Sequence, residues 1–139
     1  MYLRLANDLG SSVPAQLLAL ALLDHLDDLA QRRRATLAAT VERAVEHLRS
    51  SVPDWQLSEP EGGSVLWATL PVADSAAFVH LAGRHGVHVV PGSAATPERA
   101  PGPHVRICVD RPWPLVEAGL QRLALAWREH EARTGPVLG

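Results

Sequence analysis

The 139-residue chain contains no lysine, because all 13 of its basic residues are arginine. A chain without lysine cannot form a Schiff base between a lysine amine and the carbonyl group of a cofactor or substrate. A single cysteine, Cys108, excludes an internal disulfide bond and a zinc site built from several cysteines. Aromatic residues make up only 4% of the chain, so its four tryptophans are expected to anchor a core or an interface.

Neither sign of charge dominates the chain, whose formal net charge is -2. Such a balance provides no basic field for a phosphate backbone, so we expect no direct contact with nucleic acid. The longest apolar run, "LLALALLDHL", is too short to span a membrane and is interrupted by Asp24 and His25. The opening "MYLRLANDLG" lacks the apolar core of a secretion signal, and we therefore expect a cytoplasmic protein.

The pattern of residues 8–50 predicts two linking helices. Ser11 or Ser12 is suited to cap the first helix, and Pro14 to lie in its first turn. Residues 13–23 are apolar nearly all round, which predicts that another surface covers this helix. Residues 26–50 repeat apolar side chains at three- and four-residue steps between charged ones, which predicts a longer amphipathic helix.

From residue 51 the pattern changes to β-β-α-β-β-α. Asp74 is suited to cap the first helix of this part, and Gly86 to end it. The expected strands and helices, in chain order, are 55–59, 64–70, 75–85, 87–91, 104–109 and 114–130. These elements predict an α+β fold, in which a small, mainly antiparallel sheet carries helices on one face. We expect a domain over residues 51–130 and a tail over 131–139.

Arg106 is a cation in an otherwise apolar strand. Because side chains alternate between the two faces of a strand, Val105, Ile107 and Val109 should face the helices, and Arg106 the uncovered side. A guanidinium fixed there matches a carboxylate with two parallel hydrogen bonds. The alternative is a solvated or salt-bridged arginine on an open sheet.

Three stretches resemble, in order and spacing, the C-terminal part of the fold-type I aminotransferases that depend on pyridoxal phosphate. They are "EPEGGSVLWATLP", "GVHVVPGSAATP" and "HVRICV" followed by "PLVEAGLQRLALAW". The earlier "DLGSSVPAQLLALALL" resembles the part after the cofactor lysine in MocR-type transcription regulators of the GntR class. The resemblance extends from about residue 8 to residue 130.

The resemblance implies roles for particular residues. Arg106 would bind the α-carboxylate of an amino-acid-like ligand. Gly62 and Gly63 would approach the active site, and the turn of Pro91, Gly92 and Ser93 would shape its entrance. Pyridoxal phosphate would be held by an N-terminal large domain that this sequence does not include, since the cofactor lysine has no counterpart. The chain alone is then expected to carry no catalytic residue, to be incompetent as a transaminase and to form a homodimer.

Three functions remain open at this point. The sequence favours the effector-sensing part of a MocR-type regulator over a fragment of a conventional class I/II aminotransferase. A stand-alone α+β ligand-binding or interaction module is the third possibility. The histidines at positions 80, 85, 88 and 104 lack the spacing of a metal site, and we expect no bound metal. No "GxSxG" segment supports a nucleophilic serine.

Overall fold

A computed structural model gives the structure of the chain and describes residues 12–58, 60 and 62–134. The chain divides into two compact units, residues 1–36 and residues 37–139, and the division falls within a long helix. Within the described residues, no helix combines the length and the apolar character needed to cross a membrane.

The first unit contains helix α2 (Val13–Leu23) and the beginning of helix α3 (Leu26–Ser51). Leucine and alanine dominate α2, and these residues favour a helix. Ser12 is its N-cap residue, although its side chain makes no capping hydrogen bond; Ser11 lies outside the described residues. Every residue of α2 is exposed, so the apolar surface that the sequence predicted to need a cover is uncovered in this chain.

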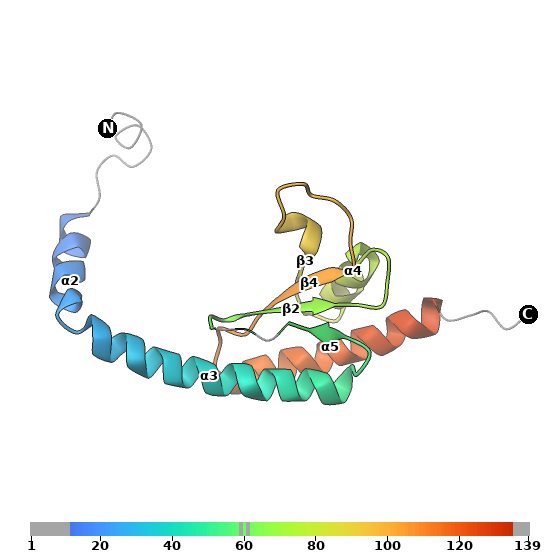
Figure 1. The fold of residues 1–139 in the computed structure, drawn as a ribbon, viewed down its shortest axis with the longest axis horizontal. Coiled ribbons are helices and arrows are strands. Elements are labelled where there is room, and N and C mark those ends of the chain that lie inside the picture. The colour runs from blue at the N-terminus through green and yellow to red at the C-terminus, as the bar shows by residue number, and fades with distance from the viewer. Residues whose placement is uncertain (1–11, 59, 61, 135–139) are drawn as a thin grey trace, which may run out of the picture. The chain divides into compact units, whose positions relative to one another are not determined.

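The second unit is built on a four-stranded sheet with the order β1-β2-β4-β3 (Figure 1). All three neighbouring pairs are antiparallel. The strands are β1 (Gln56–Leu57), β2 (Val65–Thr69), β3 (Val90–Pro91) and β4 (His104–Cys108). The expected α+β architecture and the order β-β-α-β-β-α are therefore confirmed.

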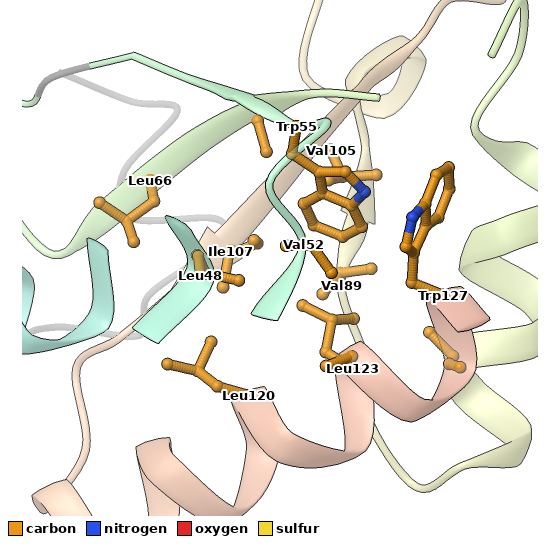
Figure 2. Packing of buried hydrophobic residues seen from close by; sticks show 14 of the residues in the cluster. Leu48, Val52, Trp55, Leu66, Val89, Val105, Ile107, Leu120, Leu123 and Trp127 are labelled. Carbon is orange, nitrogen blue, oxygen red and sulfur yellow. The ribbon is translucent and has the colours of Figure 1, made fainter. Parts of the chain in front are cut away.

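Three helices supply the apolar side chains that cover one face of this sheet: the C-terminal part of α3, α4 (Ala76–Arg84) and α5 (Trp113–Thr134). Figure 2 shows Leu48 of α3 and Leu123 of α5 in the same core as Ile107 of the sheet. The buried core consists of Ala44, Leu48, Val52, Trp55, Leu66, Ala68, Leu70, Phe78, Leu81, Ala82, Val89, Val105, Ile107, Val109, Val116, Leu120, Leu123, Ala124, Ala126 and Trp127.

Aromatic rings fill one end of this core. Trp55, Phe78 and Trp127 meet edge to face, with each pair of ring centroids 5.3 Å apart. His130, which is 7% exposed, stacks on Trp127. Edge-to-face contacts of this kind stabilise a core by about 0.5–1.5 kcal/mol per pair beyond the burial of apolar area. Through this cluster, α4 and α5 pack against the segment that follows α3.

Helix α4 begins and ends one residue inside the expected 75–85, and its N-cap residue is Ser75 where the sequence predicted Asp74. The Asp74 carboxylate accepts a hydrogen bond of 3.0 Å from the backbone N–H of Ala76, which is the first residue of the helix. Gly86 follows the C-cap residue with a φ of +75°. Glycine adopts this left-handed conformation without the steric cost that a side chain would add, and it therefore ends the helix.

Several element lengths differ from the sequence prediction. The expected strands 55–59 and 87–91 are shorter, because only the two residues of β1 and of β3 pair with a neighbour. Helix α5 extends beyond the expected 114–130 to Trp113–Thr134. Residues 131–134 of the expected tail are thus helical, and residues 135–139 lie outside the described residues. Residues 92–94 form a short 3-10 helix, η1 (Gly92–Ala94), within the expected loop.

Candidate functional site

Strand β4 separates its side chains between the two faces of the sheet. Val105 and Ile107 are buried against the helices, whereas Arg106 is exposed on the other side. The expected direction of Arg106 is confirmed. We call the uncovered side the open face; its side chains are Gln56, Val65, Trp67, Thr69, Val90, His104, Arg106 and Cys108.

Arg106 lies in the middle of a row that crosses three strands. Its backbone pairs with Trp67 of β2 on one side and with Val90 of β3 on the other. Residues directly opposite each other in an antiparallel pair share a face and have Cβ atoms about 4.5–5.5 Å apart. With the residues that the structure describes, the Arg106 guanidinium makes no hydrogen bond or ion pair. It is therefore a cation held in the centre of a sheet without an anionic partner among them.

His104 lies beside this row and contacts Trp67. The imidazole of His104 lies edge to face with the Trp67 indole, at 6.2 Å between ring centroids. The backbone carbonyl of His104 accepts a hydrogen bond of 2.8 Å from the buried Ser75 hydroxyl. A Cβ atom built on Gly92 would lie only 2.7 Å from the Cβ of His104, so only glycine lets η1 approach β4 this closely. The beginning of the loop over residues 92–103 is thus held against His104, two positions before Arg106 in β4.

The two glycine-containing turns lie at opposite ends of β4. Pro91 pairs with Val105, and Gly92 packs against His104, which places the Pro91–Ser93 turn at the N-terminal end of β4. Gly62 and Gly63 precede Val65, whose partner Cys108 is at the C-terminal end. Gly63 has a φ of +84°, and a Cβ atom on Gly62 or Gly63 would meet nothing within 4 Å. The structure brings the Pro91–Ser93 turn next to the Arg106 row, but it shows no contact between Arg106 and the glycine pair.

The alternation along residues 104–109 predicts that His104 shares a face with Arg106, and the structure agrees, but the sequence analysis does not identify Trp67 as a neighbour of the candidate site. The four tryptophans were all expected to be core or interface anchors, and Trp55 and Trp127 are indeed buried. Trp67 is half-buried and belongs to the open face, because the buried residues of β2 are Leu66 and Ala68. The alternation of residues 65–69 was the signal that could have placed its indole beside Arg106.

A small pocket of about 100 Å³ lies elsewhere in the second unit. It is formed by the segment before β3, the end of β4 and the N-terminal half of α5. Its lining does not include Arg106. The residues around it are Val87, His88, Val89, Ile107, Cys108, Val109, Arg111, Leu115, Val116, Gly119, Leu120 and Leu123. The pocket is mostly apolar, and it does not extend the row that contains Arg106.

The histidines do not gather into a metal site: within the described residues, no three His, Cys, Asp or Glu side chains lie close enough to share an ion. His85 instead pairs with Glu129 of α5, at 2.6 Å between Nε2 and Oε2. Glu129 also accepts a hydrogen bond from Arg133. The hydrogen bond from His85 is the main cause that holds the pKa of Glu129 below its ordinary value. This cluster links the end of α4 to α5 and lies outside the candidate site.

Comparisons with known proteins agree on one kind of relative. The family model described as aminotransferase class I and II matches residues 2–123. Among solved structures, the chain resembles LysN, an α-aminoadipate aminotransferase from Thermus thermophilus, with 20% identity and a TM-score of 0.84. It also resembles a multiple substrate aminotransferase from Thermococcus profundus, with 24% identity and a TM-score of 0.79. A kynurenine aminotransferase from Pyrococcus horikoshii is similar as well, with 26% identity and a TM-score of 0.79.

The match covers most of this chain but only part of each relative. It includes 96%, 96% and 93% of the chain, respectively, but only 35%, 34% and 33% of those three proteins. The chain therefore spans about a third of the length of the solved structures that it matches. No curated protein matches the chain by sequence.

Proposed function

Because this chain belongs to the class I and II aminotransferase family, we propose that it is the small domain of an aminotransferase and that Arg106 binds the α-carboxylate of the substrate. The observation that carries the proposal is the Arg106 guanidinium, which projects from the centre of β4 on the open face. The substrate would be an amino acid or the corresponding oxo acid, since both carry this carboxylate.

The chemistry of the row suits a carboxylate. A guanidinium presents a planar set of N–H donors that can hold both oxygens of a carboxylate at once. Each hydrogen bond to a charged group stabilises a complex by about 1.5–3 kcal/mol. Trp67 and Val90 flank Arg106 with apolar surface, on which the apolar part of a substrate could lie while its carboxylate binds the guanidinium.

The residues of this chain do not fit covalent attachment of pyridoxal phosphate, because the chain has no lysine. The Thermus thermophilus relative was solved with N-(5'-phosphopyridoxyl)-L-leucine, and the Pyrococcus horikoshii relative with PMP. In the proposed function, a larger domain holds the cofactor, and this chain contributes only the binding and orientation of the substrate carboxylate. The chain alone would then not be a competent enzyme.

The family model and the solved structures describe aminotransferases, which supports an enzyme over the MocR-type regulator that the sequence favoured. Regulation of transcription stays a prediction without support from these comparisons. The exposed apolar surface of α2 supports a further part of the proposal, namely that the chain associates with the larger domain and forms a homodimer. The Pro91–Ser93 turn would border the entrance to the site, because it lies beside the Arg106 row.

The assigned role of Arg106 can be tested on the full 139-residue chain with acetate as the probe. Acetate should shift the NMR signal of the Arg106 Nε–H group, and neutral acetamide should not. Arg106→Ala should weaken acetate binding at least about tenfold, because it removes hydrogen bonds to a charged group. The matched control is Arg111→Ala, which removes an exposed arginine that follows β4 and does not lie on the open face. Equal acetate affinities for Arg106→Ala and the unchanged chain would refute the assignment.

A further inference from the structure

The side chains on either side of Arg106 are unequal in size. Trp67 stands opposite Arg106 on β2, and Val90 stands opposite it on β3. All three side chains leave the sheet on the open face, with neighbouring Cβ atoms about 4.5–5.5 Å apart. The bulky indole therefore blocks the arginine conformations that lean across β2, while the smaller valine leaves room on the side of β3.

The indole of Trp67 is supported by a second ring beside it. Trp67 contacts the His104 imidazole edge to face, with an interplanar angle of 83°. The backbone of His104 is held in turn by the close approach of Gly92 and by the hydrogen bond from the Ser75 hydroxyl to its carbonyl. Trp67 is consequently supported from the anchored loop, whereas an isolated side chain on an open sheet could rotate away.

Trp67 has no part in the aromatic cluster of the covered face. Trp55, Phe78 and Trp127 form that cluster on the other side of the sheet. Trp67 is only half-buried, and its register partner is Arg106. A large apolar ring on an uncovered face needs a local reason, and the neighbouring arginine provides one.

From this arrangement, and resting on the proposed function of Arg106, we infer that Trp67 is a positioning residue for the carboxylate-binding arginine. It directs the guanidinium away from β2, toward the side of β3 and the Pro91–Ser93 turn. A long side chain that is restricted before binding loses less conformational freedom when the carboxylate arrives. Trp67 thereby increases affinity without itself contacting the carboxylate.

The test compares acetate binding and arginine mobility in variants of the full chain. In Trp67→Ala, the order parameter of the Arg106 Nε–H bond should fall, and the Kd for acetate should rise about three- to tenfold, the range for one flexible side chain. Trp67→Phe retains an aromatic ring and should restore most of both properties. The matched control is Val65→Ala, which shortens an apolar side chain on the same strand and face but opposite Cys108. It should leave both properties close to those of the unchanged chain.

The outcomes separate this inference from the proposed function. If Arg106→Ala abolishes acetate binding but Trp67→Ala behaves like Val65→Ala, the positioning role is wrong and the function of Arg106 survives. If Arg106→Ala itself binds acetate normally, the proposed function fails. If Trp67→Ala does not fold, the positioning role can still be tested by NMR on the unchanged chain. Nuclear Overhauser contacts between the Trp67 indole and the Arg106 side chain, with a restricted Nε–H bond, are expected, and their absence would overturn the inference.

Discussion

Strand β4 contributes buried apolar side chains to one face of the sheet and an exposed arginine to the other. On the covered face of β4, Val105 is completely buried and Ile107 nearly so. On the open face, Arg106 is exposed between Trp67 and Val90. Because successive side chains of a strand point to opposite sides, residues only one position apart can be subject to different physical demands. The stability of the domain and its capacity to bind a carboxylate should therefore be separable by mutation.

The difference in stability follows from burial. The covered face brings together aliphatic and aromatic side chains from three helices and the sheet. Removal of apolar surface from water stabilises a fold by about 25 cal/mol per Å². The open face of this chain gains little of that stabilisation, since its central side chain is a solvated guanidinium. Mutations on the covered face should thus dominate the free energy of unfolding.

The largest expected effect comes from the aromatic cluster. Phe78 is completely buried and touches Trp55, Trp127 and His130. Phe78→Ala should lower the free energy of unfolding by about 3–5 kcal/mol, because it removes apolar contacts and leaves a cavity. Urea denaturation measures this change. The control Leu125→Ala, at a position on α5 that is 49% exposed, should change it by less than about 0.5 kcal/mol. A similar cost for both variants would contradict the distinction between buried and exposed positions.

A smaller effect is expected where η1 approaches β4. Gly92→Ala would place a Cβ atom 2.7 Å from the Cβ of His104 and 3.2 Å from its carbonyl oxygen. The resulting displacement should lower the free energy of unfolding by about 1–3 kcal/mol, as overpacking usually does. Denaturation midpoints measure the loss of stability, and the NMR signals of His104 report the displacement. The matched control is Gly62→Ala, whose added Cβ atom would meet nothing within 4 Å. If Gly62→Ala proves the more damaging variant, the close approach of η1 to β4 is wrong.

Local patterns in the sequence were sufficient for much of the fold. The alternation around Arg106 predicted its face, because the direction of a side chain in a strand depends on its position in the pleat. Asp74 and Gly86 predicted the ends of α4 for an equally local reason, namely their hydrogen bonding and backbone conformation. These features need no knowledge of distant parts of the chain.

The rest depends on contacts between residues far apart in sequence. The Trp67–His104 pair and the approach of Gly92 to His104 exist only once β2, β3 and β4 are in register. The two-residue lengths of β1 and β3 likewise depend on which backbone groups find a partner. Since a linear pattern does not specify these pairings, the sequence could predict the direction of Arg106 but not the side chains that surround it.

The smallest expected effect tests a polar contact beside the covered face. The hydrogen bond from His85 lowers the pKa of Glu129 in the folded chain, with a further contribution from Arg133. A carboxyl group whose pKa is lower in the folded than in the unfolded chain binds fewer protons when folded, so it stabilises the fold above its unfolded pKa. This contribution is lost as the pH falls through the folded pKa, which lies below the ordinary value of 4.5.

Glu129→Gln should therefore have a lower urea midpoint than the unchanged chain near neutral pH, and the difference should shrink as the solution is acidified below the ordinary carboxyl range. The matched control is Glu131→Gln, which alters an exposed carboxylate on the same helix. Its difference from the unchanged chain should be smaller near neutral pH, because surface charges contribute little to stability. A gap for Glu129→Gln that widens on acidification would mean that the carboxylate does not stabilise the folded state. The packing of α4 on α5 would then depend on the apolar core, without a contribution from the contact between His85 and Glu129.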